Sequence, residues 1–156
     1  MIKVLLLSDL SREPARLLIK GISRFTNSRG GWRFYQVPPA IRDNPRHIAK
    51  IVNLVHDMDI DAIFGQWKGI DVSIARRLGI PIVLYQRMEM IKGFPIVHCD
   101  NDAVGKMAAD FFMRYGNMHL TFCGFRGVVW SDERIRAYLA SVGEGIVPGF
   151  YANDNG

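Results

Sequence analysis

The sequence predicts an α/β fold in three layers, with a parallel sheet covered by helices on both faces. Short apolar runs alternate with longer amphipathic segments along the chain. The apolar runs are continuous, which is typical of parallel strands buried on both faces. Strands that alternate with helices form right-handed βαβ units and hence a parallel sheet. The length of 156 residues is sufficient for one domain with its own core.

The predicted strands are the apolar runs. The first reads KVLLLSD, so it is a continuous apolar run that ends in polar residues. The others are similarly short, and several are followed by charged or amide side chains. The predicted strands are residues 3–9, 31–37, 61–67, 80–86, 95–100 and 119–125.

The segments between the strands carry apolar residues at helical spacing. Their ends carry capping signals: Pro14 suits the first turn of the first helix after Ser11, Asn44 suits the N-cap of the second, and Ser131 or Asp132 suits that of the last. The final segment, 144–156, is rich in Gly, Pro and Asn without a period, so we expect a frayed end. The predicted helices are residues 13–28, 44–58, 70–78, 101–116 and 131–143.

The composition is that of an ordinary soluble globular protein, with 49% apolar and 22% charged residues. No apolar run is long enough to span a membrane, and the first residues lack the features of a secretory signal. We therefore expect a cytoplasmic protein without membrane contact. The net charge of +5 is spread along the chain, and the longest basic run is Arg76 and Arg77. This is a weak signal for nucleic-acid binding, because a binding surface clusters its charge.

No cofactor or metal site is expected. The stretch SDLSREPA after the first strand has no glycine, which excludes a dinucleotide fingerprint, and a P-loop is absent. Cys99 and Cys123 lie in apolar, strand-like contexts, so we expect two buried free thiols rather than metal ligands. Gly65 and Gln66 stand where a phospho-receiver domain has its aspartate. No nucleophile–base pair is evident, so an enzyme is not expected.

The carboxyl ends of the predicted strands hold the candidate ligand-binding residues, because ligands bind at this edge of an open parallel sheet. Amides, carboxylates and guanidinium groups pair with hydroxyl groups, and an indole covers the C–H face of a sugar ring. This mixture of side chains favours a neutral polyol as the ligand. The candidates are Asp9, Ser11, Arg12, Gln66, Trp67, Gln86, Arg87, Asp100, Trp130 and Arg134.

Structural alternatives stay open for several of these residues. Asp100, directly before a helix, is also a good N-cap. Trp67 also suits a core or an interface, and Gln86 and Arg87 also suit a solvated loop. Arg134 is in the first turn of a predicted helix, where the helix dipole disfavours a cation, so a functional role is favoured there.

The stretch DERIRAYL, with the order of the elements and the absent phosphate loop, resembles the type I periplasmic-binding-protein fold. That fold occurs in sugar-binding proteins and in the effector domains of lac-repressor-type regulators. The closest resemblance is to xylose-operon activators, which carry an AraC-type DNA-binding domain at the C-terminus. Their Trp-x-x-Glu-Arg-x-x-Ala-aromatic pattern falls on Trp130, Glu133, Arg134, Ala137 and Tyr138. By this resemblance, Arg134 hydrogen-bonds a sugar.

Two shorter stretches also resemble these proteins. PIVHCDN resembles their strand that leads to an Asp-Asn pair, here Asp100 and Asn101. YQR resembles the Leu-Asp-Arg of ribose-type binding proteins: Arg87 keeps the sugar-contacting arginine, and Gln86 replaces the aspartate.

The resemblance also implies a domain organisation. Residues 1–127 would form the N-terminal lobe of a sugar-sensing effector domain. Residues 128–143 would form a crossover and the first helix of a mostly absent second lobe, and 144–156 a flexible tail. The chain would then be a fragment of a longer protein or a truncated gene product.

The resemblance implies that the chain is the sugar-sensing domain of a transcriptional regulator. The expected sugar is a pentose such as xylose. Sugar would close two lobes over a cleft and shift a homodimer towards a DNA-competent state. DNA contact would come from a domain that this chain lacks, and the fragment would bind pentose weakly or not at all. The alternatives are the sugar-binding protein of an ABC-type transporter and, third, a flavodoxin-like enzyme.

Overall fold

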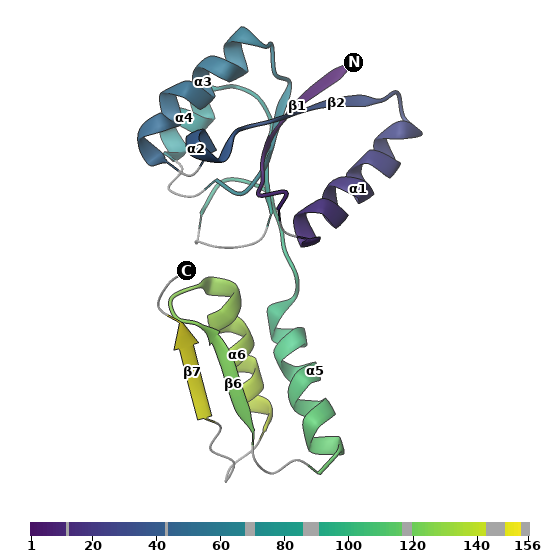
Figure 1. Ribbon diagram of the computed structural model, residues 1–156, viewed down its shortest axis with the longest axis vertical. Coiled ribbons are helices and arrows are strands. Elements are labelled where there is room, and N and C mark those ends of the chain that lie inside the picture. The colour runs from purple at the N-terminus through teal and green to yellow at the C-terminus, as the bar shows by residue number, and fades with distance from the viewer. Residues whose placement is uncertain are drawn as a thin grey trace. The chain divides into compact units, whose positions relative to one another are not determined.

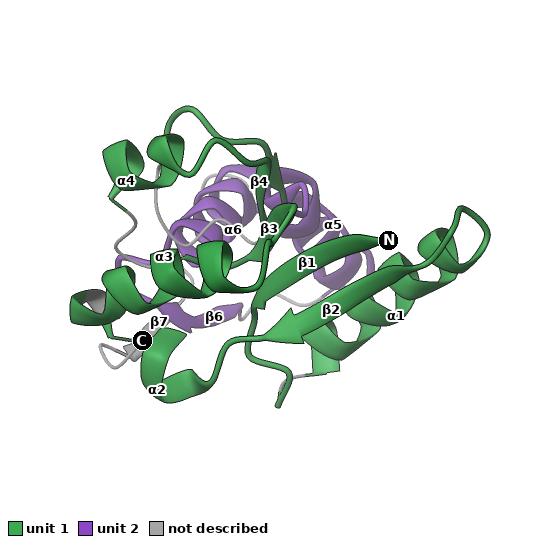
Figure 2. Cartoon of the chain, turned by 90° about the horizontal axis from the view of Figure 1, so that it is seen from above, with its two compact units in different colours: residues 1–85, 91–97 green, residues 86–90, 98–156 purple. Residues whose placement is uncertain are grey.

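The computed structural model describes residues 1–11, 13–42, 44–67, 71–85, 91–116, 120–142 and 149–153 (Figure 1). The chain divides into two compact units, coloured green and purple in Figure 2. The first unit contains residues 1–85 and 91–97, and the second contains residues 86–90 and 98–156. Residue 127, after which the sequence predicts a boundary, lies within the second of these units.

The first unit contains a five-stranded sheet in the order β2-β1-β3-β4-β5, and every neighbouring pair of strands is parallel. This confirms the predicted parallel α/β architecture. The strands are β1 (Ile2–Leu7), β2 (Trp32–Gln36), β3 (Ala62–Gly65), β4 (Ile82–Tyr85) and β5 (Ile96–Val97). The helices are α1 (Glu13–Asn27), α2 (Pro39–Arg42), the 3-10 helix η1 (Pro45–His47), α3 (Ile48–Asp57) and α4 (Val72–Arg77).

Helices cover both faces of this sheet. Helix α1 lies on one face, and α3 and α4 lie on the other (Figure 1). Leu5 and Leu7 of β1 pack in one apolar core with Ile51 and Val55 of α3. Side chains alternate along a strand, so the equally buried Val4 and Leu6 point to the opposite face. The burial of both faces explains why β1 is apolar without alternation.

The start of the second predicted helix differs from the prediction. Asn44 does not cap a long helix, because η1 intervenes and α3 begins only at Ile48. The Asn44 Oδ1 instead accepts a hydrogen bond from the Arg46 backbone N at 3.0 Å. Helix α2, which begins at Pro39, was not predicted.

The second unit contains α5 (Asn101–Arg114), β6 (Thr121–Phe125), α6 (Val129–Ser141) and β7 (Gly149–Asn153). Strands β6 and β7 pair in parallel and form a separate two-stranded sheet. The predicted sixth strand is therefore not part of the first sheet, and part of the predicted frayed tail is a strand. Helix α6 packs on α5 and β6 of the same unit.

Two further local predictions are wrong. Ser131 and Asp132 do not cap α6, which begins at Val129. Ser131 is instead buried, and its Oγ accepts a hydrogen bond from the Phe125 backbone N at 2.9 Å. Cys99 and Cys123 are free, as predicted, but both are exposed. The residue before Cys123 packs on Tyr138 of α6, so strand alternation directs Cys123 to the uncovered face of β6.

None of the helices in the described ranges is long and apolar enough to cross a bilayer. Within the same ranges, no three His, Cys, Asp or Glu side chains gather into a group that could hold a metal ion.

Candidate functional site

The loop after β1 is held by local hydrogen bonds. Asp9 Oδ1 accepts from the Ser11 backbone N at 3.1 Å and from the Ser11 Oγ at 2.6 Å. Arg16 of α1 donates from Nη1 to the Leu10 carbonyl at 3.1 Å and to the carbonyl of Ser11. These contacts order the two predicted polar residues Asp9 and Ser11. The third predicted residue, Arg12, lies outside the described residues.

Strands β1 and β3 approach closely where the next candidates lie. The Gln66 backbone N donates to the Leu7 carbonyl at 2.7 Å. A Cβ built on Gly65 would lie 2.6 Å from the Leu7 carbonyl carbon, so only glycine fits there. Gln66 is half-buried, whereas Trp67 is only 6% exposed and packs in the apolar core. Trp67 is therefore a residue of the apolar core, which was one of the alternatives for it.

Ser8 directly follows β1 and was not among the candidates, but it is an unusually buried polar residue. It is 1% exposed, and its Oγ has no hydrogen-bond partner among the described residues. Buried polar atoms are nearly always paired, so a buried hydroxyl without a described partner is unusual. The predicted residues Gln86 and Arg87 lie outside the part of the chain that the structure describes.

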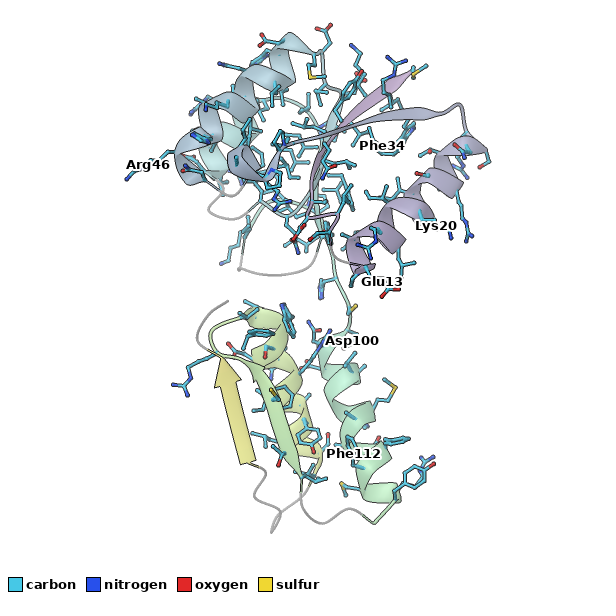
Figure 3. The ribbon with its side chains drawn as sticks, in the orientation of Figure 1. Glu13, Lys20, Phe34, Arg46, Asp100 and Phe112 are labelled. Carbon is cyan, nitrogen blue, oxygen red and sulfur yellow. The ribbon has the colours of Figure 1, made fainter. Side chains whose placement is uncertain are left out.

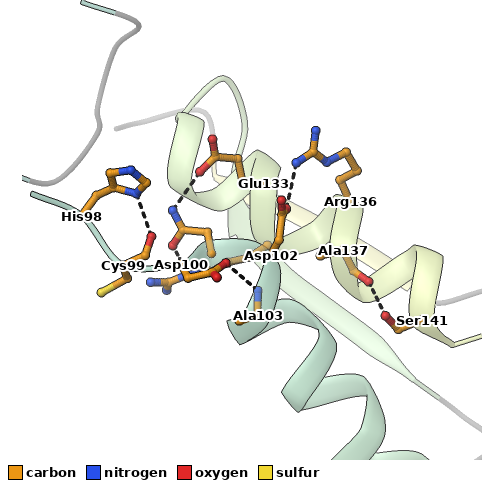
Figure 4. Close-up of polar contacts among 11 residues, drawn as sticks. His98, Cys99, Asp100, Asp102, Ala103, Glu133, Arg136, Ala137 and Ser141 are labelled. Carbon is orange, nitrogen blue, oxygen red and sulfur yellow. Dashed lines mark hydrogen bonds and ion pairs between the residues drawn. The ribbon is translucent and has the colours of Figure 1, made fainter. Parts of the chain in front are cut away.

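Asp100 directly precedes α5 in the second unit (Figure 3). Its Oδ1 accepts from the Ala103 backbone N at 2.9 Å, which is the geometry of an N-cap (Figure 4). The capping interpretation of Asp100 is therefore confirmed.

Five residues of the second unit form what we call the Arg134 cluster: Asn101, Phe125, Trp130, Glu133 and Arg134. The Arg134 Nε donates to the Asn101 Oδ1 at 3.0 Å, and the Asn101 Nδ2 donates to the Glu133 Oε2 at 2.9 Å. Figure 4 shows the hydrogen bond from Asn101 to Glu133 as a dashed line. The Arg134 guanidinium carbon lies 5.0 Å from the centre of the Trp130 ring, which is a cation–π distance. The Phe125 ring meets Trp130 edge-on, with their centres 5.7 Å apart.

The predicted pair Trp130 and Arg134 is thus brought together, with the guanidinium held at its Nε. Among the described residues, the Nη1 and Nη2 groups of Arg134 donate no hydrogen bond. They are the donors that a ligand with hydroxyl or carboxylate oxygens could use.

Close contact between α5 and α6 positions this cluster. On the exposed side of the two helices, outside the cluster, Arg136 of α6 donates from Nη2 to the Asp102 Oδ1 of α5 at 2.8 Å (Figure 4). This hydrogen bond and the charge of Asp102 raise the pKa of Arg136. Gly105 of α5 lies against the backbone of α6, so the two helices approach without intervening side chains.

Asn101 and Glu133 were not predicted as site residues. Each lies in a short sequence pattern, Asn101 in the Asp-Asn pair and Glu133 in the Glu-Arg pair. The hydrogen bond between them depends on the packing of α5 on α6, which no local sequence pattern predicts. Gly105 was the available signal, since a glycine inside a helix often marks a close helix contact.

A groove of about 380 Å³ lies elsewhere, between α3 and α4 of the first unit. Its apolar lining includes Val52 and Leu78, and His56 and Arg77 add polar groups. None of the predicted candidates contributes to it.

No protein-family model matches the chain, and no curated protein matches it. Solved structures do match. A periplasmic binding protein/LacI transcriptional regulator from Alkaliphilus metalliredigens QYMF, complexed with D-xylulofuranose, has a TM-score of 0.75 and 13% identity over 99% of this chain and 57% of that one. The trehalose repressor from Escherichia coli has a TM-score of 0.79 and 17% identity over 97% of this chain and 59% of that one.

A third match is the Cra transcriptional dual regulator from Pseudomonas putida in complex with fructose 1-phosphate. Its TM-score is 0.75, with 17% identity over 97% of this chain and 57% of that one. The chain therefore spans less than two thirds of the length of these three structures. At such low identity the likeness concerns the fold, which is the α/β fold of periplasmic-binding-protein-like domains.

Proposed function

We propose that this chain is a ligand-sensing part of a transcriptional regulator, that its ligand is a sugar, and that it is not an enzyme. The observation that carries the proposal is the Arg134 cluster. Its guanidinium is fixed beside an indole ring, and its Nη donors are directed to no other described residue. A fixed donor fork and an aromatic surface together match the hydroxyl groups and the C–H groups of a sugar.

The fold neighbours support this choice of ligand. Two of them are complexes with the sugars D-xylulofuranose and fructose 1-phosphate, and a third is a trehalose repressor. These ligands belong to those proteins. For this chain, we propose a pentose such as xylose, in line with the resemblance of Trp130 and Arg134 to xylose-operon activators.

Further ligand contacts are proposed for polar residues at the carboxyl ends of the first-sheet strands. Asp9, Ser11 and Gln66 present carboxylate, hydroxyl and amide groups that pair with sugar hydroxyls. The predicted contributions of Arg12, Gln86 and Arg87 stay part of the proposal, whereas Trp67 and Asp100 are accounted for by the core and by the helix cap.

Regulation would follow from differential affinity. A sugar that binds one conformation of the regulator better than another shifts the population towards it. We propose that the regulator is a homodimer whose subunits contact each other through helices of the first unit. We also propose that it is cytoplasmic and binds DNA through a separate domain. A sugar-binding protein of a transporter is the second candidate, because one neighbour is a periplasmic binding protein/LacI transcriptional regulator.

A thermal-shift screen tests the proposal. Pentoses, hexoses and their phosphates are added singly to the protein. A ligand at ten times its Kd stabilises a folded protein by about 1.4 kcal/mol, which is a measurable rise in Tm.

We expect a neutral pentose to raise the Tm, and we expect Arg134→Met to abolish the rise. Arg136→Met is the matched control, because Arg136 lies two residues further along α6 and pairs with the exposed Asp102. Because we expect weak binding rather than none, a Tm that no sugar changes, or a rise that survives Arg134→Met, contradicts the proposal.

A further inference from the structure

We propose that Asn101 is a positioning residue for Arg134. Its amide holds the guanidinium beside Trp130 and keeps the neighbouring Glu133 carboxylate away from the Nη donors. The ligand-binding consequence rests on the proposed function, whereas the positioning itself can be tested without any ligand.

The amide is suited to this role by its two ends. Its Oδ1 accepts from the Arg134 Nε at 3.0 Å, and its Nδ2 donates to the Glu133 Oε2 at 2.9 Å. A neutral amide can accept from a guanidinium through its oxygen and donate to a carboxylate through its nitrogen at the same time. Asn101 is only 4% exposed, so leaving either end unpaired would be costly.

The backbone around Asn101 is firmly held. The preceding Asp100 caps α5 through the Ala103 N–H, which fixes the first turn that contains Asn101. Four residues further on, a Cβ at Gly105 would meet the carbonyl of Arg134 and lie 2.9 Å from the Ala137 Cβ. The start of α5 is therefore fixed against the turn of α6 that carries Glu133 and Arg134.

Glu133 is the natural competitor for the guanidinium. It is the immediate chain neighbour of Arg134, and both residues contact the same amide. Bidentate pairing of an arginine with a carboxylate uses the same N–H groups that a ligand would use. By binding one carboxylate oxygen and the Arg134 Nε, Asn101 keeps the two charges apart and leaves Nη1 and Nη2 available.

The first measurement uses the Nε–Hε signal of Arg134 in ¹H–¹⁵N correlation spectra, assigned by its loss in Arg134→Lys. In the unaltered protein we expect a signal that exchanges slowly with water, since its hydrogen bond is to a buried amide. Asn101→Ala should shift this signal and speed its exchange. Asp102→Ala is the control on the next residue, which breaks the exposed pair with Arg136 and should leave the signal in place.

The second measurement is the affinity for D-xylose in Asn101→Ala, Glu133→Gln and the double variant. We expect Asn101→Ala to weaken binding about tenfold, which corresponds to one charge-assisted hydrogen bond. Glu133→Gln in the same chain should restore most of that loss, because no carboxylate then captures the guanidinium. A purely structural role of Asn101 would not respond to the second substitution.

Asn101→Asp is the second positioning variant, should Asn101→Ala unfold. An aspartate suits the first turn of a helix, but it replaces the amide donor with a carboxylate facing Glu133. It should also displace the Arg134 signal.

An Arg134 signal that neither variant changes, or an Asn101→Ala affinity that Glu133→Gln does not restore, overturns the inference. If the unaltered protein does not bind D-xylose, the proposed pentose ligand fails, and the Arg134 signal alone decides the positioning role.

Discussion

Gly105 of α5 lies directly against Ala137 of α6: a Cβ at position 105 would come within 2.9 Å of the Ala137 Cβ and would also meet the carbonyl of Arg134. Real Cβ contacts are longer, so any side chain at this position forces α5 and α6 apart. This contact holds the two helices of the second unit at the spacing that the Arg134 cluster requires.

Gly105→Ala should therefore destabilise the protein. Overpacking a tight contact costs about 1–3 kcal/mol, and we expect a fall of that size in the free energy of unfolding in urea. The matched control is Gly21→Ala in the middle of α1, where a new Cβ meets no atom within 4 Å. That substitution should instead stabilise by about 0.5–1 kcal/mol, because glycine is a poor helix residue. Equal effects of the two substitutions would refute the close helix contact.

Gly65→Ala should destabilise the first unit through β1. Gly65 has a φ of 152°, and its Cβ would lie 2.6 Å from the carbonyl carbon of Leu7. Gly79→Ala is the control, because Gly79 also has a positive φ but has no atom within 4 Å of the added Cβ. Backbone strain alone costs about 1 kcal/mol, so Gly65→Ala should lower the free energy of unfolding clearly more than Gly79→Ala. Thermal melts followed by circular dichroism compare the two.

The cap of α4 should make the stability depend on pH. The Asp71 side chain accepts from the Ser73 Oγ at 2.6 Å and from the Ile74 backbone N at 3.1 Å. The bond from the Ser73 hydroxyl, followed by that from Ile74, lowers the pKa of Asp71 below its usual 3.8. A carboxyl whose pKa is lower in the folded state stabilises above the unfolded-state pKa, and this contribution is lost as the pH falls through the folded-state pKa.

Asp71→Asn tests this cap, because asparagine retains the capping geometry but does not titrate. The unaltered protein should have the higher Tm near neutral pH, and the difference should disappear well below the pKa of Asp71. A difference in Tm that is the same in acid and at neutral pH would show that the Asp71 charge does not stabilise the cap.

The proposed homodimer makes a prediction about α1. The outward Leu17 and Phe25 of this helix are 58% and 51% exposed, which is unusual for large apolar side chains. Leu17→Ser should shift the mass measured by light scattering from dimer towards monomer. Phe111→Ser on α5 removes an equally exposed apolar side chain from the second unit and should leave the mass unchanged. A monomeric unaltered protein, or a response to Phe111→Ser alone, would contradict a dimer through α1.

Local patterns are enough to predict most of the first unit. The continuous apolar run in β1 indicates a doubly covered strand, and α1 and α3 are visible from helical spacing. Local patterns do not distinguish helix α2 from a loop. They also do not distinguish the 3-10 turn before Ile48 from the start of a longer helix, because Pro and Asn are common both in short helices and at helix caps. Strand β7 was missed, since Gly and Pro near it indicate irregular structure, whereas its parallel pairing with β6 is a long-range property.

The candidate site was predictable only in part. The Trp130–Arg134 pair could be found because both residues follow the predicted sixth strand and match the Trp-x-x-Glu-Arg pattern. The role of Asn101 could not, because it depends on a contact between α5 and α6 across 33 positions. Trp67 was a candidate by its place after a strand, but burial in the core decides its position.

The most direct test of the central claim is the indole N–H signal of Trp130 during a titration with D-xylose. Trp130→Phe assigns the signal by removing it. We expect weak, saturable binding with a Kd of about 1 mM or above, in line with the weak pentose binding expected from the sequence. The shift should vanish in Arg134→Met and persist in Arg136→Met. A Trp130 signal that no neutral pentose or hexose moves, or a shift that Arg134→Met leaves unchanged, would contradict sugar sensing at the Arg134 cluster.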